Sequence, residues 1–88
     1  MSKMYFVYLL KSLADGKYYI GQTNNTENRL KRHNDGFVSS TKNRRPLVLL
    51  GTESFDLRKQ ATFREYELKN NTNERLRFYK KLDKDLGE

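Results

Sequence analysis

Tyr5-Phe6-Val7-Tyr8-Leu9-Leu10, followed shortly by Lys17-Tyr18-Tyr19-Ile20-Gly21, decides the fold. Both stretches are rich in aromatic and β-branched residues, which favour β-strands. The Asp15-Gly16 pair between them is a common hairpin signal. The two stretches are therefore predicted to be antiparallel neighbours in a sheet, with their register left open by the connection from about Lys11 to Gly16.

The first helix is predicted directly after this hairpin. Asn24 with Glu27 three residues later resembles a capping box, in which Asn24 is the cap. The helix is expected over about 25–34, with Gly36 as its stop signal. Its apolar face is narrow and consists mainly of Leu30.

A third strand and two more helices are predicted beyond a loop over residues 37–45. Pro46 opens the strand over 47–50, and Gly51 ends it. Asp56 is the expected cap of a helix over about 57–69, whose inward stripe is Leu57, Ala61 and Leu68. Asn71 with Glu74 predicts the cap of a last helix over about 72–86, whose inward residues are Leu76, Tyr79, Leu82 and Leu86.

This order predicts a small α/β (α+β) fold. A three-stranded, mostly antiparallel sheet is flanked by three helices, in the order β-β-α-β-α-α. The 88 residues suit a single domain over 1–88, and 35% hydrophobic residues predict a thin core. The chain has no cysteine, which excludes disulfides, thiolate metal sites and cysteine nucleophiles and favours a cytoplasmic location. The run Tyr5–Leu10 is too short for a signal peptide or a membrane span.

The net charge of +7 indicates a polyanionic partner. Nucleic acid is the first candidate and an anionic membrane surface the second. Basic side chains that are candidates for contacts with backbone phosphates are Arg32, Lys42, Arg44 and Arg45. The same basic run also fits an ordinary solvated loop.

Five polar residues next to the predicted core suggest chemistry: Tyr8, Tyr19, Arg29, His33 and Glu65. The two tyrosines can lie close together on one face of the hairpin. Arg29 and His33 are four residues apart on the first helix, so they share one side of it. The set offers a possible base, a cation for phosphate and a carboxylate for a metal, which are the roles that phosphodiester hydrolysis needs.

Phe6-Val7-Tyr8 and Tyr19-Ile20-Gly21 resemble the paired motifs of the GIY-YIG nuclease superfamily, although Phe and Val replace Gly and Ile in the first motif. Arg29, eight residues after Gly21, matches the helix arginine of that family. The segments 41–48 and 61–65 resemble its basic loop and its alanine-to-glutamate spacing. The resemblance runs from about 4 to 70 and is nearest to small bacterial single-domain members and the N-terminal domain of excinuclease C.

This resemblance implies a divalent-metal-dependent endonuclease acting on DNA of particular structure, with DNA repair as its setting. Tyr8 would activate the attacking water, helped by Tyr19 or His33, and Arg29 would hold the scissile phosphate. Glu65 would anchor one Mg²⁺ or Mn²⁺ ion, because Mg²⁺ commonly takes only one or two protein carboxylates. Gly21 would let the backbone turn close to the site.

Two other functions remain open. The first is a non-catalytic nucleic-acid-binding module, in which Tyr8 and Tyr19 are ordinary strand aromatics and Glu65 pairs with Lys69 on the surface. In that case Tyr18 and Phe37 are candidates for stacking on unpaired bases. The second is an adaptor whose last helix, with Leu82 and Leu86, recruits a protein partner that supplies target specificity.

Overall fold

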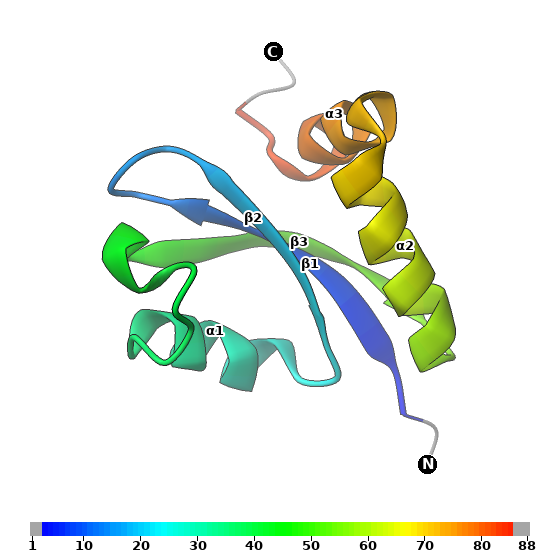
Figure 1. Ribbon diagram of the computed structural model, residues 1–88, viewed down its shortest axis with the longest axis horizontal. Coiled ribbons are helices and arrows are strands. Elements are labelled where there is room, and N and C mark those ends of the chain that lie inside the picture. Colours follow the sequence, from blue (N-terminus) through cyan, green and yellow to red (C-terminus); the bar gives the residue numbers. More distant parts are fainter. Residues whose placement is uncertain (1–2, 86–88) are drawn as a thin grey trace.

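The computed structural model describes residues 3–85, in which three strands form one sheet and three α-helices pack against it (Figure 1). The elements in chain order are β1 (Tyr5–Ser12), β2 (Tyr18–Thr23), α1 (Thr26–Asn34), the short 3₁₀ helix η1 (Lys42–Arg44), β3 (Leu47–Phe55), α2 (Arg58–Asn70) and α3 (Thr72–Leu82). The predicted fold class and element order are confirmed. None of the helices in this described part is long and apolar enough to cross a membrane.

β1 is the central strand, and the sheet order is β2-β1-β3. Both pairings are antiparallel, so the sheet is antiparallel throughout rather than mostly. The register that the sequence left open places Tyr8 opposite Gly21 on β2 and opposite Thr52 on β3. β2 is therefore an edge strand, and a side chain of β1 reaches it directly.

Successive residues of β1 point to opposite faces of the sheet. Val7 and Leu9 pack toward α2 and α3 in a cluster whose other buried members are Ile20, Ala61, Leu68 and Phe78. Tyr8 and Leu10 point the other way, into a smaller cluster with Leu47, against which Tyr19 and Leu30 pack. Figure 1 shows the same division, with α1 on one side of the sheet and α2 with α3 on the other. The thin core predicted from composition is thus split between two faces.

The cap of α1 is Asn25, not Asn24 as predicted. Its side-chain oxygen accepts the backbone N–H of Asn28 at 3.0 Å. An N-cap side chain satisfies the N–H two or three residues ahead, so the cap must directly precede the helix start at Thr26. The predicted stop is confirmed, because Gly36 has a φ of +84° and turns the chain out of the helix.

β3 does not end at Gly51, as the sequence predicted, but continues to Phe55. Leu9 pairs with Gly51 and Leu10 with Leu49, so Leu50 is an extra residue that makes a bulge in the strand. A Cβ on Gly51 would come within 2.8 Å of the Leu82 side chain. The glycine therefore permits the close approach of α3 to the sheet rather than a turn.

The inward face of α2 is partly as predicted. Ala61 and Leu68 are buried. Leu57, however, is 48% exposed, because it occupies the cap position itself, and its N–H donates to the side-chain oxygen of Gln60 at 3.1 Å. Asp56 therefore does not hold the cap position.

The inward face of α3 also differs. Asn71 caps the helix by accepting the N–H of Glu74 at 3.0 Å, as predicted. Leu76 is 51% exposed, and Phe78 is buried in its place. Phe78 lies on the same side of the helix as Leu82, one turn later, whereas Leu76 points away from that side. The helix ends at Leu82, and the predicted Leu86 lies outside the described residues.

Candidate active site

The Tyr8 side chain lies across Gly21, its partner on β2. A Cβ at Gly21 would come within 2.5 Å of the ring carbon Cζ of Tyr8. The glycine is required because it leaves room for this ring. That reason differs from the predicted one, since the backbone at Gly21 is ordinary strand and makes no turn toward the site.

The Tyr8 hydroxyl connects the two predicted side chains of α1. It lies 2.9 Å from Nε2 of His33 and accepts Nε–H of Arg29 at a longer 3.4 Å. Tyr8 is 2% exposed and His33 is fully buried. The spacing of Arg29 and His33 by one helical turn brings both to the same oxygen.

Thr41 contacts the other ring nitrogen of His33. Its Oγ1 lies 2.7 Å from Nδ1 of His33, and its own hydroxyl donates to the carbonyl of Val38 at 3.4 Å. These contacts suit the tautomer in which the Thr41 oxygen accepts from Nδ1–H and Nε2 of His33 accepts the Tyr8 O–H, and the proposed mechanism uses this tautomer. Burial, and then the charge of Arg29, lowers the pKa of His33 to about 4. The imidazole is thus neutral at pH 7.

Tyr19 completes the aromatic part of the cluster. Its ring centroid is 6.3 Å from that of Tyr8 and 5.0 Å from that of His33. The pKa of Tyr8 is raised, chiefly by burial, with Arg29 opposing and with Tyr19 and Glu65 adding to the rise. Tyr8 is therefore protonated at rest and needs an acceptor for its proton, which His33 provides.

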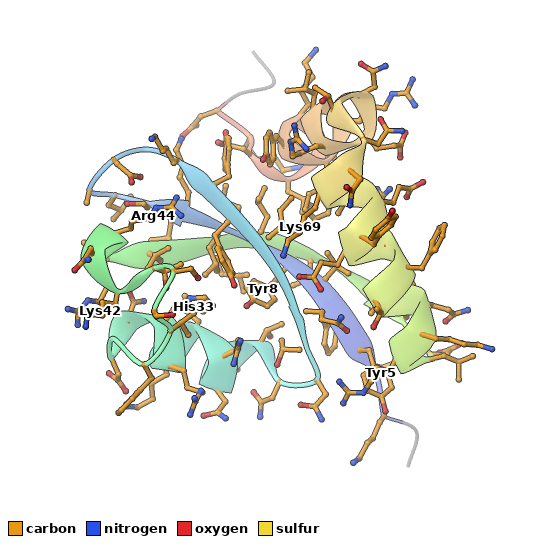
Figure 2. All side chains as sticks on the ribbon, viewed as in Figure 1. Tyr5, Tyr8, His33, Lys42, Arg44 and Lys69 are labelled. Atoms are coloured by element: carbon orange, nitrogen blue, oxygen red, sulfur yellow. The ribbon has the colours of Figure 1, made fainter. Side chains whose placement is uncertain are left out.

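Glu65 comes from α2, on the other side of the edge strand β2. Its Oε1 accepts from the Gln22 amide at 3.0 Å, and its Oε2 pairs with the ammonium of Lys69 at 2.7 Å. The ammonium of Lys69 also lies 6.0 Å from the ring centroid of Tyr19. Figure 2 shows Tyr8, His33 and Lys69 gathered about β2. The carboxylate is close enough to the cluster to contribute to the raised pKa values of Tyr8 and Arg29.

The structure thus brings all five predicted residues to one region around β2, four on the α1 side and Glu65 across the strand edge. Sequence reasoning missed three neighbours: Thr41, Gln22 and Lys69 as a partner of Tyr19. Gln22 directly follows the second motif, and this position was the signal that it lies near the site. Thr41 gave none, because it stands in a loop and meets His33 only through tertiary packing.

The predicted phosphate-binding residues have different surroundings. Lys42 and Arg45 are exposed and together line a surface hollow of about 490 Å³, and Arg32 is exposed on α1. The guanidinium of Arg44 already donates hydrogen bonds within the protein, to Asp15 at 3.1 Å and to the carbonyl of Tyr18 at 3.3 Å. Contacts between these four side chains and nucleic acid stay a prediction.

Comparison with known proteins places this geometry in a family. Residues 4–81 match the model of the GIY-YIG catalytic domain. A UPF0213 protein of Halobacterium salinarum is 40% identical over 67 residues, which make up 75% of this chain and 86% of that protein. The UPF0213 protein YazA of Bacillus subtilis is 38% identical over 76 residues, or 85% and 76% of the two chains.

A solved structure, the solution NMR structure of the UPF0213 protein BH0048 from Bacillus halodurans, is 32% identical with a TM-score of 0.49 and covers 83% of this chain and 81% of that one. The family model spans nearly the whole described chain, including the paired strands that carry Tyr8 and Tyr19. This chain belongs to the GIY-YIG catalytic domain family.

Proposed function

We propose that this chain is a divalent-metal-dependent endonuclease that hydrolyses phosphodiester bonds in DNA, and that it acts in the cytoplasm. One observation carries the proposal. The Tyr8 hydroxyl lies between a neutral imidazole that accepts its proton and a guanidinium that binds negative charge. A proton acceptor and a cation that meet at one hydroxyl supply two of the roles that phosphodiester hydrolysis needs.

Proton transfer runs along two hydrogen bonds in this mechanism. The attacking water gives its proton to Oη of Tyr8 while the Tyr8 proton passes to Nε2 of His33. The water oxygen forms a bond to phosphorus as the bond to the leaving sugar oxygen breaks. Thr41 stabilises the resulting imidazolium by accepting from Nδ1–H. Arg29 holds the phosphate and stabilises the charge that develops on its oxygens.

The surroundings of Glu65 fit a divalent metal ion. Its carboxylate is 20% exposed, and among the described residues the cation paired with it is the ammonium of Lys69, a side chain that is 49% exposed. Mg²⁺ prefers oxygen donors and completes its shell with water and phosphate oxygens, so one carboxylate suffices. Within residues 3–85 no three acidic, histidine or cysteine side chains gather into a larger metal site. A bound Mg²⁺ or Mn²⁺ would act as a Lewis acid toward the phosphate.

The test is cleavage of labelled single-stranded, duplex, nicked, flapped and branched DNA and of RNA, with Mg²⁺, with Mn²⁺ and with EDTA. Arg29→Ala and Glu65→Gln are compared with Arg77→Ala and Glu27→Gln, which make the same chemical changes at exposed positions. We expect EDTA-sensitive cutting that the first two variants lose by about 100-fold or more and the controls retain. Full metal-dependent cutting by Glu65→Gln would show that this mechanism is wrong.

The ion pair between Glu65 and Lys69 favours a second candidate, a nucleic-acid-binding module that does not cut. In that case Lys69 neutralises the carboxylate permanently, and Glu65→Gln leaves binding unchanged or tightens it. Binding would be salt-sensitive and would weaken on charge reversal at Lys42 and Arg45. Gel shifts without cutting under any metal would support this module, or an adaptor whose protein partner supplies the cutting or the target.

A further inference from the structure

Two large aromatic side chains stand on the outer face of α2, away from the core. Phe63 is 66% exposed and Tyr66 is 65% exposed. They are three residues apart on one helix, so they lie on the same face. Exposed apolar groups that are grouped and rimmed by polar residues mark interaction sites more often than scattered ones do.

These rings line a shallow groove whose charged residues are all basic. The groove has a volume of about 670 Å³, and its lining also includes Arg58, Lys59 and Thr62. The guanidinium of Arg58 lies over the ring of Tyr5, 4.9 Å from its centroid, so its position is restrained. The volume is in the range of sites that hold one small ligand. No carboxylate lines the groove, and its charge is therefore complementary to an anion.

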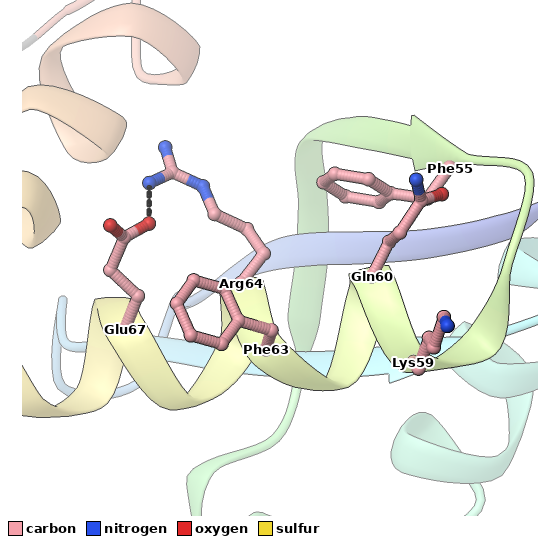
Figure 3. A pocket seen from close by; sticks show the side chains of 6 residues that line it. All are labelled: Phe55, Lys59, Gln60, Phe63, Arg64 and Glu67. Atoms are coloured by element: carbon pink, nitrogen blue, oxygen red, sulfur yellow. Dashed lines mark hydrogen bonds and ion pairs between the residues drawn. The ribbon is translucent and has the colours of Figure 1, made fainter.

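The groove on the opposite flank of Phe63 provides a contrast (Figure 3). Its lining includes Glu67, which pairs with Arg64 at 2.7 Å. Arg64 is neutralised further by carboxylates outside this groove. Lys59 lines both grooves, but the charge of Arg64 is matched within the protein and Glu67 adds a negative charge, so the groove beside Tyr66 is the more basic of the two.

The basic groove is connected to the candidate active site. Thr62, which lines the groove, accepts a hydrogen bond from the Gln22 amide at 3.0 Å, and the same amide contacts Glu65 at 3.0 Å. Tyr66 directly follows Glu65 in α2. Thr62 precedes Glu65 by nearly one turn, which is about 5 Å along the helix axis. A DNA strand whose scissile phosphate lies near Glu65 would therefore continue along this face of α2.

We propose that this groove binds an unpaired nucleotide of the DNA strand that flanks the scissile phosphate. The base stacks against Tyr66 and Phe63, and the phosphate is held by Arg58 and Lys59. Stacking on aromatic side chains accepts any base, but it needs a base whose face is free. The inference rests on the proposed function and names its substrate class, which is DNA with a single-stranded segment beside the cut.

The experiment measures binding in EDTA, so that it does not depend on cutting. The probes are a single-stranded oligodeoxynucleotide that contains 2-aminopurine, whose fluorescence falls on stacking, and a blunt duplex of the same sequence. The proteins are the wild type, Tyr66→Ala, Phe63→Ala, the double variant, and Leu76→Ala as a control that removes a half-exposed apolar side chain from α3.

We expect each ring removed to weaken single-strand binding by about 5-fold or more and to reduce the fluorescence quenching, with duplex binding and the Leu76→Ala control unchanged. Equal single-strand binding by the wild type and the double variant would overturn the inference, while the cleavage results for Arg29→Ala and Glu65→Gln would stand. A wild type that sediments as a dimer and a Tyr66→Ala variant that sediments as a monomer would also overturn it, because the face would then pair two copies of the chain.

Discussion

Thr41 and Tyr8 hold the two nitrogens of one buried imidazole, that of His33. Because the Thr41 oxygen takes the proton on Nδ1, the lone pair on Nε2 faces the tyrosine. In the proposed mechanism the direction of this hydrogen-bond chain decides whether Tyr8 can lose a proton. In this mechanism the chemistry thus depends on a residue with no catalytic group of its own.

Replacement of Thr41 by Val tests this arrangement. The methyl group fills the same space but cannot accept from Nδ1–H, so the other tautomer of His33 becomes populated and Tyr8 loses its acceptor. We expect cleavage to fall by about 10- to 100-fold with little change in DNA affinity. Thr41→Ser should restore cleavage, and this rescue separates the lost hydroxyl from a packing defect. If Thr41→Val cut as the wild type does, Thr41 would have no positioning role.

His33 also predicts how stability depends on pH. Its pKa in the folded protein is about 4, below the ordinary value of 6.5, so the unfolded chain binds more protons between these values. Stability should therefore decrease as the pH falls from about 6.5 to about 4, by on the order of 2 kcal/mol. Urea unfolding across this range measures the effect, with His33→Gln as the comparison. His33→Gln should lose the decrease in stability between pH 6.5 and about pH 4. If its stability depended on pH as that of the wild type does, His33 would not be the cause.

Some residues of the candidate site could be predicted from the sequence, and Thr41 could not. Tyr8, Tyr19, Arg29 and Glu65 lie on regular elements at family spacings, so order and periodicity located them. Thr41 lies in a loop, where no periodicity relates it to His33 eight residues earlier. Such contacts depend on tertiary packing, and sequence patterns record local geometry only.

α1 carries Arg29 and His33, and its start determines where both point. The cap at Asn25 satisfies a backbone N–H that would otherwise be unpaired, whereas the predicted cap, Asn24, lies outside the helix. Asn25→Ala should lower the free energy of unfolding by about 1 kcal/mol. Asn24→Ala is the matched control and should leave it within about 0.5 kcal/mol. Chemical denaturation distinguishes them, and equal losses would mean that Asn25 has no special capping role.

At the scale of elements, the sequence predicted which helices and strands exist but placed several boundaries wrongly. Neighbouring asparagines compete for one cap, and Asn25, whose extended backbone directly precedes the helix, occupies it. Gly51 was interpreted as a strand end because glycine is rare inside strands. Its actual role, leaving space for Leu82, depends on α3, which packs there from far along the chain.

The whole molecule is joined at Arg64, which connects three elements. Its guanidinium binds Glu53 on β3 at 2.7 Å, Glu67 on α2 at 2.7 Å and Glu74 on α3 at 2.9 Å. The arginine side chain is only 19% exposed. The network was not predicted, because its members are distributed over three elements whose packing the sequence pattern does not specify.

Arg64→Met keeps the apolar stem but leaves these partly buried carboxylates without their shared cation. We expect the free energy of unfolding to fall by about 2 to 4 kcal/mol. Nucleic-acid cleavage at low temperature should persist, because Arg64 lies away from Tyr8. Arg77→Met, which removes a 78% exposed arginine paired with Glu74, should change stability by less than about 0.5 kcal/mol. Thermal or urea unfolding of the two variants decides whether the network holds the elements together.

The alternation along β1 also bears on how this chain can change in length during evolution. Val7 and Leu9 face the larger core cluster, while Tyr8 and Leu10 face the side of α1 and the candidate active site. Losing or gaining one residue inside the strand would exchange the two faces, so that the tyrosine entered the core and a leucine replaced it beside the imidazole. The exposed turn over residues 13–17 has no such constraint. Insertions and deletions should therefore accumulate in that turn and be eliminated from the strand beside it.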